Sequence, residues 1–368
     1  MRLRRGSALL GVVALTLSAC GDDNPTRAFE TSGGVLPGRA EVQLEGTLSA
    51  SGSSAQESAM TAWIAGYRGV QPDVTMIYDA IGSGGGRQNL ISGASPLVGS
   101  DAYLDEEERA AVTRRCGPGG AVHVPVYIAP IAIPYHLPGV DELNLSPEVL
   151  AQVFARDIRT WDDPRIQQLN PAVDLPETEI TVVNRSDDSG TTENFLEYLH
   201  AVGGQAWPYE PDPSWPVPGG ESAAQTTGVM MVVGATEGAV TYTDASAVGE
   251  LDTARIGVGD EFVAYSPEAA AAVIDASEPV DTGVEGDLAL EVARDTTASG
   301  VYPIVLVSYH IACTSYDDAD TAALVKDFLR FVVSEEGQQQ AAEAAGSAPI
   351  SEQLREAALQ TIDSIQGG

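Results

Sequence analysis

Basic residues are scarce in this chain. Its 368 residues include 19 Lys and Arg against 53 Asp and Glu, which gives a formal net charge of −34 at pH 7. Nucleic-acid affinity depends on Lys and Arg meeting phosphates, so this balance excludes a nucleic-acid-binding protein. It also disfavours binding to an anionic membrane surface, unless a covalent anchor holds the chain there. The simplest consequence of the acidity is solubility.

Cysteine and histidine are scarce too. Three Cys and four His are too few and too scattered for a structural zinc site, and no cluster would hold the two metals of a phosphatase. None of the His residues stands beside a Ser-containing motif, whereas a Ser nucleophile needs a nearby base. We therefore expect no catalytic residue, no metal and no cofactor, and a secreted serine hydrolase is the least favoured function.

Long apolar segments are missing, apart from a short one at the N-terminus. A basic start (MRLRR) precedes an apolar run over residues 8–17, which is shorter than the roughly 20 residues that span a bilayer. This pattern predicts a secretory signal peptide over residues 1–19. The run ends in LSACG, which resembles a bacterial lipobox, whose Cys becomes the lipidated first residue of the mature protein. We expect a lipid anchor at Cys20. Ordinary cleavage after Ala19, with a free thiol, is the alternative.

The rest of the chain can build a large core. Hydrophobic residues make up 43% of the sequence, and 368 residues suit two lobes. Residues 20–46 lack periodicity and carry Pro and Gly, so we expect a tether there. After it, strands alternate with helices, which predicts an α/β fold. We expect strands at residues 74–78, 122–135 (broken by its prolines), 179–184 and 302–311. We expect helices at residues 56–67 and over most of 317–368. Further helices should begin after residues 82–86, 105, 146, 192 and 266.

Three segments of small and hydroxyl residues each precede an expected helix. They are residues 51–55 (SGSSA), 82–86 (GSGGG) and 188–192 (DSGTT). The first turn of a helix has unpaired N–H groups and the positive end of the helix dipole, and Gly lets an anion approach the backbone. Three such turns brought together would form an oxyanion site. Each Ser taken alone is more often a helix cap, and no segment has the Lys of a nucleotide-binding P-loop.

Two charged residues fit such a site. Arg185 lies four residues before Ser189, and its guanidinium can clamp two oxygens of a tetrahedral anion while Asp187 holds it in place. A surface ion pair is the alternative. Asp101 fits if the anion carries a proton, because an ionised carboxylate accepts hydrogen bonds and does not donate them. Phosphate at neutral pH has such a proton and sulfate does not. A helix cap is the alternative for Asp101.

Together these motifs resemble the phosphate-binding protein family of the bacterial high-affinity phosphate ABC transporter. Residues 182–192 (VVNRSDDSGTT) look like the family's R-S-D-G-S-G-T-T loop, and 78–86 (YDAIGSGGG) are similar to its Y-x-x-x-G-S-G-x-G turn. Residues 99–102 (GSDA) resemble its A-S-D-A. Weaker matches are WDDP at 161–164 with NP at 170–171, and SAPI at 347–350. The resemblance extends from about residue 48 to residue 350.

The resemblance implies a type II periplasmic-binding-protein clamshell with a ligand cleft between two lobes and two chain crossovers. Lobe 1 would comprise residues 47–127 with 302–368, and lobe 2 residues 128–301. The implied function is extracytoplasmic phosphate binding, with hinge closure around the anion and delivery to a permease. We expect a monomer, held at the outer face of the cell membrane by its anchor. The implied phosphate-binding residues are Ser53, Ser54, Ala55, Ser83, Asp101, Arg185, Ser189, Gly190 and Thr191, with Asp187 orienting Arg185.

Some residues depart from the family pattern. Ala55 stands where many members have Phe, and Asp188 replaces a Gly, so we expect the Asp188 side chain to point to solvent. Residues 234–244 follow the pattern loosely, and the Pro-rich residues 208–220 lie outside it. Another oxyanion or an organophosphate therefore stays an alternative ligand. Outside the cytoplasm Cys116 and Cys313 can form a disulfide, with two buried thiols as the alternative.

Overall fold

The computed structural model describes residues 42–274 and 276–368. The predicted signal peptide, most of the tether and the expected lipidation site at Cys20 lie outside the described residues. Within the described part of the chain, no helix is both long and apolar enough to cross a membrane.

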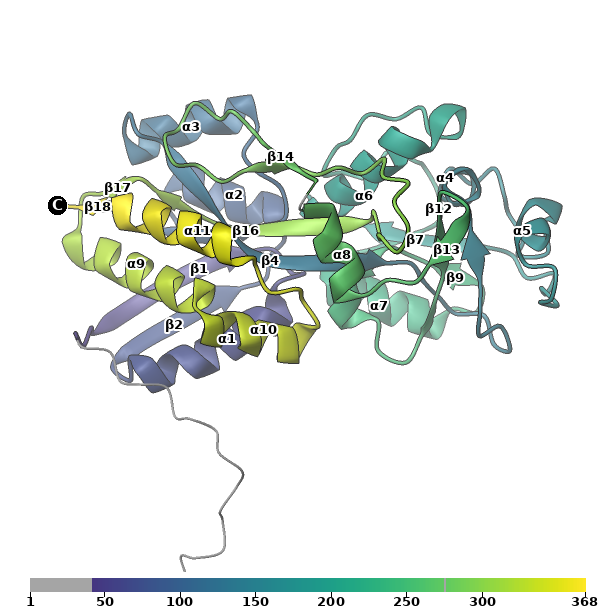
Figure 1. The fold of residues 1–368 in the computed structure, drawn as a ribbon, viewed down its shortest axis with the longest axis horizontal. Coiled ribbons are helices and arrows are strands. Elements are labelled where there is room, and N and C mark those ends of the chain that lie inside the picture. Colours follow the sequence, from purple (N-terminus) through teal and green to yellow (C-terminus); the bar gives the residue numbers. More distant parts are fainter. Residues whose placement is uncertain (1–41, 275) are drawn as a thin grey trace, which may run out of the picture. The chain divides into compact units, whose positions relative to one another are not determined.

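A six-stranded mixed sheet forms one half of the fold (Figure 1). Its strand order is β10-β4-β16-β3-β1-β2. β1 is parallel to β2 and β3, whereas β16 is antiparallel to β3 and β4. The parallel strands β1 and β3 end side by side, with Gly52 opposite Gly99, so the segments that follow them start at one edge of the sheet. The strands are β1 (Gly46–Gly52), β2 (Val74–Asp79), β3 (Leu97–Ser100), β4 (Ala121–Ala132), β10 (Thr243–Asp244) and β16 (Val305–Cys313).

Helices from both ends of the described chain accompany this sheet. α1 packs against α10, and α9 against α11 (Figure 1). The apolar spacing in α1 buries Met60, Trp63 and Tyr67 on one face, and Tyr67 meets Phe328 of α9 edge to face. Asp105 and Glu108 form a capping box at the start of α3, as its sequence predicts. The helices are α1 (Glu57–Val70), α2 (Ser83–Ser92), α3 (Glu106–Cys116), α9 (Ala319–Val333), α10 (Glu335–Ala345) and α11 (Glu352–Ser364).

A five-stranded sheet organises the other half, in the order β11-β5-β9-β7-β8. Within it, β7 lies between β8 and β9 and is parallel to both. The strands are β5 (Pro134–Tyr135), β7 (Thr181–Arg185), β8 (Glu221–Ala223), β9 (Ala239–Val240) and β11 (Asp252–Thr253). The helices are α4 (Pro147–Phe154), α5 (Pro164–Leu169), α6 (Gly190–Val202) and α7 (Gln225–Ala235). A small sheet joins β6 (Asn144–Leu145), β12 (Arg255–Val258) and β13 (Glu261–Val263).

The segment over residues 122–135 differs from the prediction. We expected its prolines to break it into pieces, but β4 continues through Pro125 and Pro130 for 12 residues, and the break falls only before Pro134, where β5 begins. Pro125 lies opposite Tyr309, next to a register shift between Ser308 and Tyr309. A β-bulge tolerates a residue without an N–H donor, which explains how the strand accommodates Pro125.

A further segment, besides the chain crossovers, contacts the two halves. We call residues 278–294 the strap; it follows α8 (Pro267–Ile274) and contains the two-residue strands β14 (Glu278–Pro279) and β15 (Leu290–Glu291). The predicted boundaries assign it to lobe 2. In the structure, however, Asp287 accepts from the backbone N–H of His123 in β4, and Thr361 of α11 donates to the Gly286 carbonyl. Both contacts are with elements of the predicted lobe 1.

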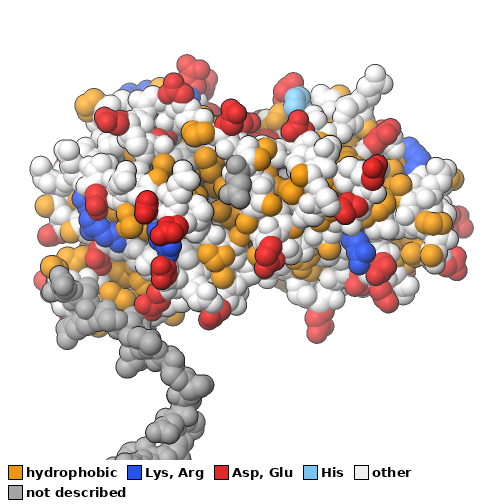
Figure 2. All heavy atoms as spheres, viewed as in Figure 1, with side chains coloured by type: hydrophobic (Ala, Val, Ile, Leu, Met, Phe, Trp, Pro, Cys, Tyr) orange, Lys and Arg blue, Asp and Glu red, His pale blue; other side chains and the backbone are white. Residues whose placement is uncertain are grey.

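The surface keeps the acidity of the sequence. Figure 2 shows Asp and Glu side chains spread over one face, with few Lys and Arg among them.

At one end of the six-stranded sheet, a disulfide joins Cys116, the last residue of α3, to Cys313, the last of β16. Beyond it, β17 (Ser315–Tyr316) pairs with β18 (Gln366–Gly367) near the C-terminus.

Candidate functional site

The N-termini of α2 and α6 face each other across the two halves of the fold. The Gly84 N–H donates to the Asp188 carbonyl at 3.2 Å. The approach is close, because a Cβ on Gly190 would lie 2.7 Å from Ser83 Oγ and 2.8 Å from Asp101 Cβ. Gly82 has a φ of +97°, which favours glycine, and its N–H donates to the Gly52 carbonyl at the end of β1. The three predicted segments therefore meet, and two helix dipoles converge on one place.

Asp101 lies at this meeting point, directly after β3. Its side chain is buried, and its Oδ2 accepts from Ser83 Oγ at 3.3 Å and from Thr191 Oγ1 at 3.2 Å. These hydroxyls come from α2 and α6, so one carboxylate oxygen is shared by both halves of the fold. The Asp101 carbonyl accepts from Asn194 Nδ2 at 2.6 Å. Asp101 is thus not a free helix cap; it is held from both sides.

Arg185 and Asp187 form the expected pair. Arg185 is buried at the end of β7, and its Nε and Nη2 donate to the two carboxylate oxygens of Asp187 at 2.8 and 2.5 Å. Asp187 Oδ1 also accepts from the Gln225 N–H at 2.9 Å. Burial acts to raise the pKa of Asp187, but hydrogen bonds and charge from Arg185 outweigh it and lower the pKa. The Nη1 edge of Arg185 is the part that Asp187 does not engage.

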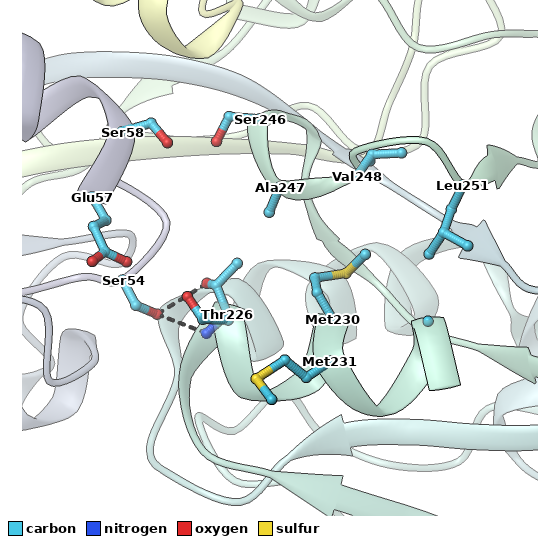
Figure 3. A pocket seen from close by; sticks show the side chains of 12 residues that line it. Ser54, Glu57, Ser58, Thr226, Met230, Met231, Ser246, Ala247, Val248 and Leu251 are labelled. Atoms are coloured by element: carbon cyan, nitrogen blue, oxygen red, sulfur yellow. Dashed lines mark hydrogen bonds between the residues drawn. The ribbon is translucent and has the colours of Figure 1, made fainter. Parts of the chain in front are cut away.

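The segment before α1 contacts the second half through Ser54. Its Oγ lies 3.0 Å from Thr226 Oγ1 and accepts from the Thr226 N–H at 3.2 Å (Figure 3). Beside this contact an open groove of about 470 Å³ runs along α7, lined by Met230, Met231 and Leu251 among others. Ser53 accepts from the Ala55 N–H at 3.1 Å. Ser53 therefore acts as a local cap at the start of this segment.

Ser189 and Asp188 also have local partners. Ser189 Oγ accepts from the Thr192 N–H at 3.2 Å, which is the helix-cap role that the sequence left open, and its own N–H donates to the Pro213 carbonyl. Asp188 is exposed, as expected, and accepts from Ser214 Oγ at 3.0 Å. The Pro-rich loop 208–220 thus packs on the turn before α6.

Four further polar residues lie at this place and were not predicted from the sequence, namely Gln56, Asn194, Thr226 and Ser308. Thr226 had a signal, because TTG at 226–228 has the same small, hydroxyl-rich composition as the three chosen segments. Asn194 lies one helical turn after Gly190, whose carbonyl it also contacts. Ser308 lies within a strand that is otherwise apolar, and no local pattern marks it.

A half-buried carboxylate lies beside the N-termini of α2 and α6. Glu193 of α6 lies 3.8 Å from Arg87 Nη2 of α2. Burial raises the pKa of Glu193 to about 7, and the charge of Arg87 opposes this shift. Arg87 is bound more closely to Glu108, with 2.9 Å between Nε and Oε1.

The serine hydroxyls at this site bond to other polar groups of the site. Over residues 42–274 and 276–368, no group of three His, Cys, Asp or Glu is arranged to hold a metal ion. The hydroxyls of Ser54, Ser83 and Ser189 bond to Thr226, Asp101 and the Thr192 N–H rather than to a histidine ring. The arrangement offers hydrogen-bond donors, one carboxylate acceptor and one guanidinium, which suits the binding of a small anion.

The fold belongs to a known class. Residues 37–336 match the family model of the PBP superfamily domain. A solved structure described as a high affinity periplasmic phosphate-binding protein (PfluDING) bound with phosphate superposes with a TM-score of 0.68, at 20% identity, over 84% of this chain and 92% of that one. The chain is therefore a binding protein of the PBP superfamily, with the type II clamshell fold that the sequence predicted.

Sequence relatives show which family of this superfamily the chain is similar to. Phosphate-binding protein PstS 3 of Mycobacterium leprae is 35% identical over 341 residues, which cover 90% of this chain and 92% of that protein. Phosphate-binding protein PstS2 of Mycobacterium bovis is 33% identical over 380 residues, which cover 99% and 100%. Within the superfamily, the chain belongs to the PstS family of phosphate-binding proteins.

Proposed function

We propose that this protein binds inorganic phosphate outside the cytoplasm and delivers it to the permease of a phosphate ABC transporter. The observation that carries the proposal is the position of Asp101 Oδ2 between Ser83 and Thr191, at the convergence of two helix N-termini. A carboxylate there repels an anion that has no proton to donate. It accepts a hydrogen bond from one that does. Membership of the PstS family supports the same ligand.

The proposed binding residues act from both halves of the fold. When phosphate enters, the Ser83 and Thr191 hydroxyls turn from Asp101 to the anion, and the N–H groups at the start of α2 and α6 donate to its oxygens. Arg185 presents its Nη1 edge while Asp187 holds the guanidinium plane. Thr226 joins the ligand set opposite Ser54. The other proposed binding residues are Ser53, Ser54, Ala55, Ser83, Asp101, Arg185, Ser189, Gly190 and Thr191, with Asp187 behind Arg185.

Transport requires the protein to open, close and stay near its permease. Contacts such as Gly84 to Asp188 and Ser54 to Thr226 join the two halves, so their making and breaking would accompany closure. We further propose that Cys20 carries the lipid anchor and that the protein acts as a monomer without a catalytic step. The lobe boundaries at residues 127–128 and 301–302 stay part of this proposal, with the strap as a further connection.

The test is calorimetry on the protein from residue 21 onward, stripped of bound anion and titrated at neutral pH. We expect phosphate to bind with a dissociation constant of about 1 μM or lower, which is about −8 kcal/mol, and sulfate to give no heat. Asp101→Asn should lose most of the preference for phosphate over sulfate, because an amide can donate to either anion. Equal binding of both anions by the unmodified protein would point to a general oxyanion receptor instead.

A further inference from the structure

A chain of buried polar side chains lies behind Asp101, on the side away from the predicted ligand. Ser308 Oγ donates to Asp101 Oδ1 at 2.5 Å, and Gln56 Nε2 lies 2.5 Å from Ser308 Oγ. Gln56 Oε1 lies 3.2 Å from Nε2 of His310. Ser308, Gln56 and His310 are each at most 1% exposed. Ser308 and His310 come from β16, and Gln56 is the residue directly before α1.

A backbone carbonyl sets the direction of each hydrogen bond among these buried side chains. Gln56 Nε2 also donates to the Tyr309 carbonyl at 3.2 Å, and a carbonyl can only accept. The reverse amide orientation would place Oε1 against that carbonyl. Gln56 therefore donates to Ser308 as well, and the single Ser308 proton is left for Asp101 Oδ1. At the other end, Gln56 Oε1 accepts from Nε2–H of His310, whose pKa is lowered to about 3 by burial, so its ring is neutral.

We propose that Ser308 and Gln56 are positioning residues that hold the Asp101 carboxylate with Oδ1 turned inward and Oδ2 turned to the ligand. Because Oδ1 accepts the Ser308 proton, Oδ2 is the oxygen left to accept a hydrogen bond from a protonated anion. The selection of protonated anions by Asp101 therefore depends on this buried chain as well as on the carboxylate. The inference rests on the proposed function, because it concerns how the site tells phosphate from sulfate.

The decisive variant is Ser308→Ala, with the ratio of sulfate to phosphate dissociation constants measured at neutral pH. Without the Ser308 donor, the Asp101 carboxylate is free to turn, so Oδ2 no longer meets the anion in a fixed position and the selection against sulfate weakens. We expect the ratio to fall by about ten- to a hundredfold, the range for a hydrogen bond to a charged group. Ser308→Thr keeps the hydroxyl and should restore the ratio. Gln56→Met removes the donor that directs the Ser308 proton toward Asp101 Oδ1, so its ratio should also fall.

The matched control is Ser95→Ala. Ser95 is also a buried serine beside the six-stranded sheet, but its Oγ bonds to Ser51 at 3.0 Å. We expect its ratio to equal that of the unmodified protein. A packing defect would weaken both anions equally and leave the ratio intact, so an unchanged ratio in Ser308→Ala and Gln56→Met would overturn the proposal. Failure of the unmodified protein to bind phosphate would instead overturn the proposed function.

Discussion

Gly190 shows how a single residue decides whether the site can form. A Cβ at this position would meet Ser83 Oγ at 2.7 Å and Asp101 Cβ at 2.8 Å. Carbon atoms do not approach so closely without moving a neighbour, and both neighbours belong to the other half of the fold. The missing side chain is therefore a condition for closure as well as for the approach of an anion to the backbone.

We predict that Gly190→Ala weakens phosphate binding by about ten- to a hundredfold, since overpacking costs roughly 1–3 kcal/mol. Calorimetry gives the affinity. Gly234→Ala is the control, because Gly234 lies in α7 with nothing within 4 Å of its Cβ position. It should bind phosphate normally, and its helix should be slightly more stable. Normal affinity in Gly190→Ala would mean that the two helix N-termini do not close on the ligand.

Glu193 predicts a pH dependence of stability. Its pKa in the folded protein is raised to about 7 from an ordinary value of 4.5, so the folded state binds more protons than the unfolded state between these values. Stability from this group is full below about pH 4.5 and is lost as the pH rises through 7. Glu193→Gln removes the ionising group. Its melting temperature should therefore rise relative to that of the unmodified protein as the pH increases from about 5 to 8.

Thermal unfolding across this pH range tests the prediction. The exposed Glu343→Gln in α10 is the matched control and should follow the unmodified protein at every pH. Parallel melting curves for Glu193→Gln and the unmodified protein would show that Glu193 is hydrated in the folded state.

At the scale of elements, the strap ties the two halves together at separate points. Asp287 bonds to His123 of β4, with 2.9 Å between Oδ2 and Nδ1. At the other end, Arg294 donates to Glu197 of α6 at 2.8 Å and to the Val305 carbonyl at 2.9 Å. It also donates to Asn194, which in turn donates to the Asp101 carbonyl. The strap is thus linked to the candidate site through two buried side chains.

We predict that Arg294→Ala lowers the free energy of unfolding by about 1–3 kcal/mol. It leaves Asn194 Oδ1 and the Val305 carbonyl without this donor, and Glu197 without its ion pair. Urea unfolding measures the loss. Arg255→Ala is the control, because Arg255 forms an exposed pair with Glu142 at 3.4 Å and should change stability by less than about 0.5 kcal/mol. Equal effects of the two substitutions would argue against a structural role for the strap contact.

At the scale of the whole molecule, one covalent bond connects distant parts of the chain. The disulfide joins residues 197 apart in sequence. Such a cross-link restricts the unfolded chain, and the removal of a native disulfide typically costs about 2–5 kcal/mol. We predict a loss of this size when a reductant is added before urea unfolding. A double variant, Cys116→Ala with Cys313→Ala, should be equally destabilised and insensitive to the reductant. No effect of the reductant on the unmodified protein would contradict the prediction.

The net charge of −34 concerns the whole molecule as well. Charges farther than about 8 Å from the anion are largely screened at physiological salt, whereas the proposed contacts are local hydrogen bonds. We therefore predict that phosphate affinity changes by less than about threefold between low and physiological salt. Calorimetry at both ionic strengths checks this. A steep fall with added salt would mean that long-range attraction, rather than the helix N-termini, holds the anion.

The sequence by itself determined the fold family, the expected binding segments and most helix beginnings. These features are local: a Ser or Asp cap, a Gly turn and a loop motif act within a few residues of each other. The loop containing Arg185, Asp187 and Ser189 could therefore be read directly. The cap role of Ser189 was also among the alternatives that the sequence left open.

Only the tertiary structure decided which groups surround these segments. Ser54 meets Thr226 across 172 residues, and Ser308 meets Asp101 across 207. The continuation of β4 through two prolines and the path of the strap also depend on contacts between residues far apart in the sequence. Such contacts depend on how sheets and helices pack, because the partners are brought together by burial rather than by neighbouring sequence. The residues that hold Asp101 in place were visible only once the chain had folded.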